Sequence, residues 1–383
     1  MALLLFDTLS GSRQSLPDGP IKLYVCGITP YDTTHLGHAF TFVQFDTLVR
    51  ALRWLEPERP LTYVQNVTDI DDSILIRARK LGVDWRELGD AQTAQFRADM
   101  QALNVAEPTH FVPATAAMPT ILDLIQILEQ RGAAYPVAGG SVFFRVGATP
   151  TYGELSKLSR DQMLDIAAHQ DDADVDDPRK EDPLDFALWK GWSGDPAEPC
   201  WPSPWGAGRP GWHIECSALC FRYLGAQITL HGGGADLKFP HHESEIAQSE
   251  LATGERPFVR TWVHTAMVRM DGEKMSKSLG NMVFVRDLLA KYSVDALRVY
   301  LLSHHYRTVF EWAPAEVEAA ASLAERFSLA AREPDQGGAS AREAFRVALK
   351  DDLNTPQALE VLERTAGITL RELGGILGLQ FSH

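Results

Sequence analysis

The chain has 383 residues, with 36 Lys and Arg against 51 Asp and Glu, and a formal net charge of −15. Hydrophobic residues make up 45% and charged residues 23% of it, which is typical of globular proteins and excludes collagen-like and wholly disordered chains. At roughly 150 residues per domain, this length corresponds to two or three domains. The acidic balance argues against nucleic-acid binding over the whole surface but is compatible with a local basic groove.

The sequence gives no sign of export or of membrane insertion. No apolar run approaches the ~20 residues of a membrane-spanning helix. The opening MALLLF leads to an aspartate without the basic segment of a signal peptide. We therefore expect a cytoplasmic protein with no membrane partner. The cysteines are too few for a disulfide scaffold, so a clustered pair would favour metal binding or catalysis. They are Cys26, Cys200, Cys216 and Cys220.

The predicted elements of the first 110 residues alternate between strands and helices. A β-rich segment covers 22–26, and apolar residues recur at helical spacing over 38–55. A second strand is expected over 61–66, and further helices over 72–103. This order of strand, helix, strand and helix predicts a parallel α/β sheet.

The next hundred residues depart from this alternation. A helix is expected over 118–131 and a short strand over 141–145, followed by a stretch rich in Asp and Pro over 170–183. The α/β pattern resumes near Gly211, and the chain is helical in pattern after Pro314. We therefore expect four segments: the first half of the sheet domain at 1–110, an inserted connective subdomain at 111–205, the second half of the sheet domain at 206–313, and an all-α region at 314–383.

Two histidines follow the first predicted strand, in the stretch Thr34–His38. A helix N-terminus carries unpaired N–H groups and a partial positive charge, which suits a phosphate group. His35 and His38 are three residues apart, so they can lie on one face of the first helical turn. Gly37 between them lets a ligand approach the backbone. Taken alone, this spacing is more often that of capping or core histidines.

A lysine- and serine-rich stretch occupies Asp271–Asn281 and predicts a mobile loop. It contains Lys274 and Lys277. Lysine is a compact positive charge that can neutralise a phosphate as negative charge develops on it. A solvated basic loop is the ordinary interpretation of such a stretch on its own.

Four candidate metal ligands are spread along the chain. Cys26 ends the first predicted strand, and Cys216 follows the stretch PGWHIE. His241 and Glu245 are four residues apart, so they share one helix face. Thiolate, imidazole and carboxylate groups all bind zinc, which also accepts a further soft ligand such as a substrate thiolate. Such a site would distinguish cysteine from serine chemically, where a steric pocket supplies only about 1–3 kcal/mol.

These residues also have ordinary structural roles. A lone cysteine is most often a small buried hydrophobic side chain. The neighbouring His242 could be mistaken for a ligand. Helical geometry pairs it with Ile246, whereas His241 is paired with Glu245, and only the second pair offers two donors.

The sequence HLGH at 35–38, followed by KMSKS at 274–278, resembles the paired signatures of class I aminoacyl-tRNA synthetases. The second motif matches at every position, and the first differs only in Leu36, where isoleucine is usual. Further stretches extend the resemblance to the cysteinyl-tRNA synthetase family, from about Leu4 to Leu377. They are YVCGITPYD at 24–32, QNVTDIDD at 65–72, WGAGRPGWHIEC at 205–216, HGGGAD at 231–236 and DDLNTP at 351–356.

This resemblance implies a Rossmann-type class I synthetase catalytic domain, formed by 1–110 and 206–313 around the inserted subdomain. Both signature motifs would bind ATP, with Lys277 the main lysine of its loop. The implied catalytic residues are His35, His38, Lys274 and Lys277. The implied zinc ligands are Cys26, Cys216, His241 and Glu245, and the implied cysteine contacts are Thr68 and Trp212. The implied ATP contacts are His35, Gly37, His38, Gly232, Gly233, Gly234, Asp236 and Lys277.

The resemblance also implies a reaction. The carboxylate of L-cysteine would attack the α-phosphorus of ATP to give cysteinyl-adenylate and pyrophosphate, with one Zn²⁺ ion per chain and Mg²⁺ bound through the nucleotide. The expected acceptor is the 3′ end of tRNA(Cys), and a monomer is expected. One alternative is a mycothiol-type ligase, which joins cysteine to the amine of glucosaminyl-inositol. A second alternative is a non-catalytic synthetase-like paralogue.

Several observations bear on the acceptor. The stretches TYGELS at 151–156, PLDFALW at 183–189 and FPHHESEIAQ at 239–248 look like the tRNA enzymes, whereas ITPYD at 28–32 looks like the mycothiol-type ligases. Ordinary cysteinyl-tRNA synthetases continue into an anticodon-binding domain, and we expect none after the all-α region of this chain. Residues 315–383 carry 7 Lys and Arg against 11 Asp and Glu, which is atypical of a polyanion-binding surface.

Overall fold

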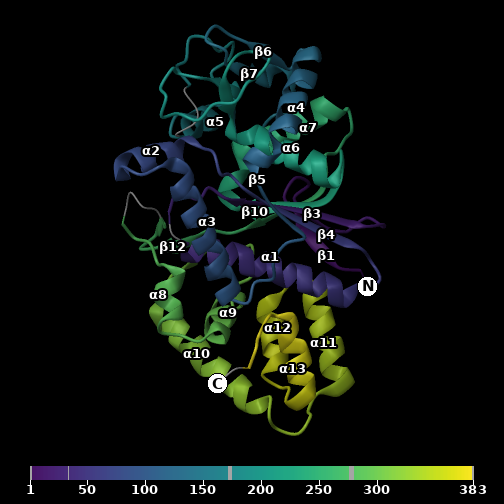
Figure 1. Cartoon of the computed structure of the whole chain (residues 1–383). Coiled ribbons are helices and arrows are strands. Elements are labelled where there is room, and N and C mark those ends of the chain that lie inside the picture. Colours follow the sequence, from purple (N-terminus) through teal and green to yellow (C-terminus); the bar gives the residue numbers. More distant parts are fainter. Residues whose placement is uncertain (1, 33, 171–174, 276–279, 382–383) are drawn as a thin grey trace.

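The computed structural model describes residues 2–32, 34–170, 175–275 and 280–381 (Figure 1). Its centre is a five-stranded sheet in the order β11-β10-β3-β4-β5, in which every pair of neighbours is parallel. The predicted parallel α/β sheet is thereby confirmed. Its strands are β3 (Ile21–Ile28), β4 (Leu61–Val67), β5 (His110–Pro113), β10 (Ile228–Gly234) and β11 (Val259–Thr265).

The strand order reverses between β3 and β10. From β3 the chain passes through α1 (Leu36–Leu55) to β4 on one side, while β10 flanks β3 on the other side. In open parallel sheets, ligands bind in the crevice outside the carboxyl ends of the strands at such a reversal. Cys26 lies two residues before the end of β3, and Gly234 ends β10. The fold therefore directs both residues toward this crevice.

The sheet separates two hydrophobic cores. Successive strand residues point to opposite faces, so Leu23 and Val25 of β3 pack in the core that contains α1, whereas Tyr24 and Cys26 pack in the other core. This second core contains α6 (Trp212–Leu224) and α7 (His241–Thr253), which contact each other. The metal-ligand candidates from strand and helices thus converge because they face the same core.

The segment between β5 and α6 lies at one end of the molecule in Figure 1, and residues of α4, β7 and β8 share a hydrophobic core with α6 and α7. This segment contains a four-stranded antiparallel sheet in the order β6-β7-β8-β9. The helix predicted over 118–131 is present as α4, and part of the predicted polar stretch lies outside the described residues. The elements are η1 (Ala114–Ala117), α4 (Met118–Gln130), β6 (Ala134–Pro136), β7 (Val142–Phe144), η2 (Val146–Ala148), α5 (Arg160–Ala167), β8 (Phe186–Gly191) and β9 (Gly208–Pro210).

The remaining elements surround the sheet domain, with α11, α12 and α13 gathered at the end opposite to the inserted subdomain (Figure 1). Within the described residues, no helix combines the length and apolar composition needed to cross a bilayer. These elements are β1 (Leu4–Asp7), β2 (Ser12–Ser15), α2 (Asp72–Leu81), α3 (Trp85–Ala102), η3 (Ala235–Lys238), β12 (Val268–Met270), β13 (Glu273–Lys274), α8 (Val285–Leu289), α9 (Val294–Leu302), β14 (Phe310–Glu311), α10 (Pro314–Ala330), α11 (Gly338–Lys350), α12 (Thr355–Leu362) and α13 (Gly367–Ile376).

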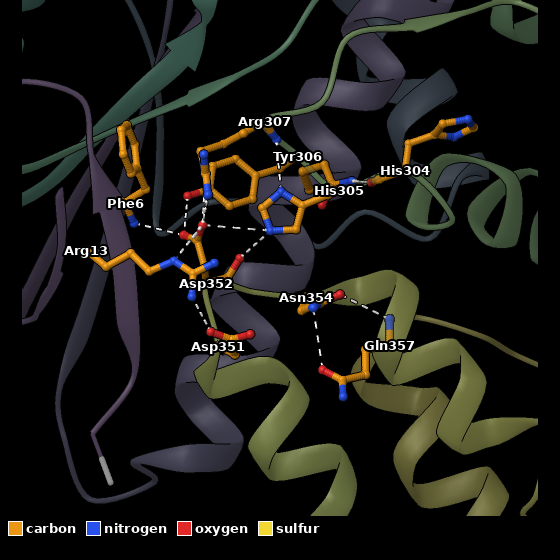
Figure 2. A network of polar contacts seen from close by, with 11 residues as sticks. Phe6, Arg13, His304, His305, Tyr306, Arg307, Asp351, Asp352, Asn354 and Gln357 are labelled. Carbon is orange, nitrogen blue, oxygen red and sulfur yellow. Dashed lines mark hydrogen bonds and ion pairs between the residues drawn. The ribbon is translucent and has the colours of Figure 1, made fainter. Parts of the chain in front are cut away.

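A buried carboxylate joins the helical region to the sheet domain (Figure 2). Asp352, in the loop after α11, accepts hydrogen bonds from the Phe6 backbone N–H (2.8 Å), the Tyr306 hydroxyl (2.6 Å) and Arg307 Nε (2.8 Å). Tyr306 and Arg307 lead into β14, which pairs with β12 through Phe310. Asp352 therefore anchors the segment that supports the strand preceding the lysine-rich motif.

Candidate active site

A cavity of about 500 Å³ opens where the strand order reverses. It is lined by residues from β3, the start of α1, the end of β4, α6, the end of β10 and α7. Most of the predicted site residues that the structure describes take part in this lining. They are Cys26, His35, Gly37, His38, Thr68, Trp212, Cys216, Gly234, Asp236 and His241.

Four potential metal ligands meet beside this cavity, and three of them, Cys26, Cys216 and His241, line it. Donor atoms of Cys26, Cys216, His241 and Glu245 all lie within 4.8 Å of one another, and the four residues are buried. The two sulfur atoms are 3.9 Å apart, Cys26 Sγ is 3.5 Å from Glu245 Oε1, and His241 Nε2 is 3.3 Å from the same oxygen. β3, α6 and α7 are far apart in the sequence, but they pack in one core, and this packing brings the four donors together.

The spacing of these donors fits a tetrahedral zinc ion. Zn–S bonds of about 2.3 Å and Zn–N or Zn–O bonds of about 2.0–2.1 Å give tetrahedral edges of about 3.8 Å between sulfurs. The same bond lengths give about 3.6 Å from sulfur to oxygen and about 3.3 Å from nitrogen to oxygen. Three edges can be compared: the separations Cys26–Cys216, Cys26–Glu245 and His241–Glu245 agree with these values within ~0.2 Å.

Burial governs the protonation of the donors. Burial lowers the pKa of His241, which keeps the imidazole neutral and able to bind a metal. Burial raises the pKa of the Cys26 thiol, which donates a hydrogen bond to Cys216. Burial also acts to raise the pKa of Cys216, but hydrogen bonds from Cys26 and Tyr24 lower it overall. A divalent cation at this point would favour both thiolates, because a coordinating thiol loses its proton.

Two further histidines contact the donor group, although the sequence pattern argues against His242 as a ligand and indicates no role near a metal for His231. His242 Nε2 is 3.2 Å from Cys26 Sγ, and His231 Nε2 is 3.0 Å from Glu245 Oε2. With Cys26 and Glu245 they form a second group whose donors lie within 4.8 Å of one another. His231 and His242 do not line the cavity, whereas Cys26, Cys216 and His241 do. Three of the four predicted donors therefore line the cavity, whereas only Cys26 of the second group does so.

The histidine pair marks the start of α1. His35 is the N-cap residue, its Nδ1 accepts a hydrogen bond from the Gly37 N–H (3.1 Å), and its ring stacks on that of His38 at 3.8 Å. Both rings line the cavity at a helix N-terminus, where phosphate oxygens are stabilised. A Cβ atom at Gly37 would lie 2.9 Å from His35 Cε1, so a side chain at this position would displace the His35 ring.

The segment around the lysine-rich motif borders the same cavity. Met275 and Met282 line it, and an isolated bridge pairs Phe284 with His35. The two signature motifs are therefore neighbours in space. Lys277 lies outside the described residues, and of Lys274 the structure describes only the backbone, in β13. The roles predicted for these two lysines stay predictions.

The glycines at the end of β10 face two different surroundings, the cavity and the core. Gly234 lines the cavity, as does Asp236. Gly232 lies instead against the core, where a Cβ atom would be 2.3 Å from Phe45 Cζ and 2.5 Å from the Val263 carbonyl oxygen. Close packing of α1 on the sheet requires this glycine. Gly232 and Gly233 are not among the lining residues, and contacts between them and adenosine stay a prediction.

The predicted cysteine contacts lie beside the donor group. The Trp212 indole stacks on the His241 ring at 4.4 Å, with an interplanar angle of 28°. The Thr68 hydroxyl accepts a hydrogen bond from Asn66 Nδ2 (3.1 Å) and faces the same cavity. An apolar ring and a polar residue thus line the cavity that Cys26 and Cys216 also line.

A family model described as the catalytic domain of class I tRNA synthetases (C) matches residues 12–322. The chain belongs to this family. The fold is also similar to that of Mycobacterium tuberculosis methionyl-tRNA synthetase in complex with methionyl-adenylate, with a TM-score of 0.64 over 93% of this chain and 82% of that one. At 16% sequence identity, this likeness is one of fold alone.

Curated relatives of higher identity are named for cysteine ligation. The chain is 46% identical to an L-cysteine:1D-myo-inositol 2-amino-2-deoxy-alpha-D-glucopyranoside ligase from Frankia casuarinae, over 98% of this chain and 80% of that protein. It is 45% identical to the ligase of the same name from Thermomonospora curvata, over 98% and 90%. These relatives favour the sugar amine, the alternative acceptor, over tRNA(Cys).

Proposed function

We propose that the chain is an ATP-dependent ligase that joins the carboxyl group of L-cysteine to the amine of 1D-myo-inositol 2-amino-2-deoxy-α-D-glucopyranoside, forming AMP and pyrophosphate. The observation that supports the cysteine part is the buried group of donor atoms from Cys26, Cys216, His241 and Glu245, beside the cavity that His35 and His38 line. The relatives carry the choice of acceptor. Because the reaction consumes ATP and cysteine, we place it in the cytoplasm.

In the first step, a cysteine carboxylate oxygen attacks the α-phosphorus of ATP, and the bond to the bridging oxygen of pyrophosphate breaks. No protein nucleophile is needed, so the protein acts by positioning and by stabilising negative charge. His35 and His38, at the N-terminus of α1, would face the phosphates together with Lys274 and Lys277. Mg²⁺ would enter with the nucleotide.

Selection of cysteine would depend on the donor group. Cys26, Cys216, His241 and Glu245 would hold one Zn²⁺ ion, which supplies a soft Lewis acid for the substrate thiolate when bound. Trp212 would cover the substrate side chain, and Thr68 would hold the substrate near its amino end. A hydroxyl is a poor ligand of such a site, so serine would be rejected by more than the about 1–3 kcal/mol that pocket shape provides.

In the second step, the neutral amine of the acceptor attacks the carbonyl carbon of cysteinyl-adenylate. The new bond is an amide, and AMP leaves with the electrons of the acyl–oxygen bond. This acceptor, unlike tRNA, needs no nucleic-acid-binding groove, which agrees with a chain whose net charge is −15.

The experiment that tests this proposal measures which acceptor receives the cysteine. Zinc-loaded protein receives ATP and labelled L-cysteine, with total tRNA in one sample and glucosaminyl-inositol in the other. The proposal predicts label in a base-stable small-molecule amide. Label that precipitates with tRNA and is released by mild base would identify an ester at the tRNA 3′ end, and would replace the proposed acceptor by tRNA(Cys).

A further inference from the structure

A second, smaller cavity lies between the sheet edge and two helices. Its volume is about 160 Å³. It lies on the α1 side of the outer strands β4 and β5, and α3 forms its opposite wall. Its lining combines three phenylalanine rings with a few polar side chains. The lining includes Phe42, Gln65, Phe96, Arg97, Ala106 and Phe111.

The deepest polar group of this cavity lacks a partner. Gln65 is only 4% exposed, and its Oε1 accepts a hydrogen bond from the Tyr63 hydroxyl at 3.0 Å. Its Nε2 has no hydrogen-bond partner among the described residues. A buried amide donor left in this state costs free energy unless something accepts from it. The lining residue Gln65 therefore has a buried donor that an oxygen acceptor could satisfy.

The mouth of the cavity carries a cation. Arg97 pairs with Glu107 at 2.5 Å, and its guanidinium lies 5.6 Å from the centre of the Phe111 ring. Both charged side chains are more than half exposed, so their pairing contributes little to stability. A ligand carboxylate can therefore take the place of Glu107 while Arg97 stays on the aromatic ring.

The walls are preformed and connect to the ATP side of the candidate active site. The Ala106 N–H donates to Asp46 Oδ1 (3.0 Å), which fixes the loop at the mouth to α1. Phe42 of α1 lines both cavities, and its ring meets Phe96 edge-on at 5.1 Å. Phe42 lies two turns after His35, the N-cap of the same helix.

We propose that this cavity binds a small aromatic carboxylate with an oxygen acceptor at the far end of its ring, and that its occupancy changes ATP affinity through Phe42. A cavity of about 150 Å³ lined by apolar residues holds benzene, so one ring fits here. The ring oxygen would accept from Gln65 Nε2, and the carboxylate would pair with Arg97 at the mouth.

The probe is 4-hydroxybenzoate, and binding is measured by titration calorimetry on the full chain, without activity. Benzoate, which lacks the inner oxygen, is the matched probe. Gln65→Leu is expected to weaken the binding of 4-hydroxybenzoate about tenfold, which is the effect of one lost hydrogen bond to a buried donor. The affinity for benzoate is expected to stay unchanged. Ala106→Leu, which fills the cavity, is expected to abolish binding of both probes. Circular dichroism and melting verify that both variants fold.

The coupling is measured as the dissociation constant of ATP with and without saturating probe. A change in the wild type that is absent in Ala106→Leu supports the proposal, and the probe's own affinity must change by the same factor in the presence of ATP. Absence of saturable binding at millimolar probe, or binding that survives in Ala106→Leu, overturns the site. Binding without any change in ATP affinity overturns the coupling. None of these results depends on the acceptor of the ligase reaction.

Discussion

The sulfur atoms of Cys26 and Cys216 lie 3.9 Å apart, although 190 positions separate the two residues in the sequence. Cys26 reaches this point from the end of β3, and Cys216 from the second turn of α6. His241 and Glu245 complete the group from the first turns of α7. One strand and two helices that share a core therefore supply all four donors.

We predict that Cys216→Ser loses zinc and cysteine-dependent pyrophosphate exchange together, because the hydroxyl is a poor zinc ligand. Metal analysis after dialysis against a chelator and the exchange assay measure the two effects. Cys220→Ser is the matched control, since Cys220 is buried in the same helix one turn later and lies outside the donor group. Full exchange activity in a zinc-free Cys216→Ser protein would contradict the assignment.

Gly37→Ala should impair the ATP step. The new Cβ atom would lie 2.9 Å from His35 Cε1 and displace that ring from the helix N-terminus. Misplacement of about 1 Å can reduce the rate about a hundredfold, so we expect a decrease of about 10–100-fold in kcat/KM for ATP. Gly89→Ala in α3 is the control, because a Cβ atom there meets nothing within 4 Å. Equal values of kcat/KM for ATP in the two variants would contradict the proposed role of His35 in binding the phosphates.

Asp352→Asn should destabilise the chain. This fully buried carboxylate accepts from Phe6, Tyr306 and Arg307, and the amide cannot replace its charge (Figure 2). Since Arg307 is partly exposed, we expect a loss of about 1–3 kcal/mol in the free energy of unfolding. Urea unfolding measures it. The adjacent Asp351, which is half exposed, provides the control Asp351→Asn, with an expected loss below about 1 kcal/mol.

Acid should destabilise the fold through its buried imidazoles. Burial lowers the pKa of His264 and of His213 well below the usual value. Below about pH 6.5, the unfolded chain binds protons at these positions and the folded chain does not. The free energy of unfolding therefore keeps the full contribution of these neutral imidazoles above that pH. It decreases as the pH falls, by up to about 1.4 kcal/mol per pH unit for each group.

Urea unfolding at several pH values and constant zinc concentration measures this dependence. His264→Gln should reduce the slope, because one buried imidazole is removed, whereas His169→Gln at an exposed position should leave it unchanged. A pH slope that is the same in wild type and His264→Gln would exclude His264 from the effect.

The sheet could be predicted from local sequence patterns, whereas the complete set of four donors was implied by the resemblance to the cysteinyl-tRNA synthetase family. The run 22–26 is buried on both faces and reads as a strand, and His241 and Glu245 share a helix face whatever surrounds them. Cysteine, histidine and glutamate are zinc ligands by residue type. These signals do not require the tertiary structure.

What the sequence could not reveal depends on packing between distant elements. His231 meets Glu245 only because β10 lies beside β3 and α7 covers that face, and His242 meets Cys26 for the same reason. The packing requirement at Gly232 likewise comes from Phe45 of α1. The local motifs point to both acceptors, so they do not decide between them, and the relatives favour the sugar amine.

The most direct test of the account is X-ray absorption at the zinc edge of the loaded protein, with and without L-cysteine. The account predicts two sulfur ligands at about 2.3 Å in the free protein. It predicts a third sulfur after addition of L-cysteine and no change after addition of L-serine. A sulfur count that stays the same with L-cysteine would contradict thiol binding at the Cys26–Cys216–His241–Glu245 site, and with it the proposed basis of substrate selection.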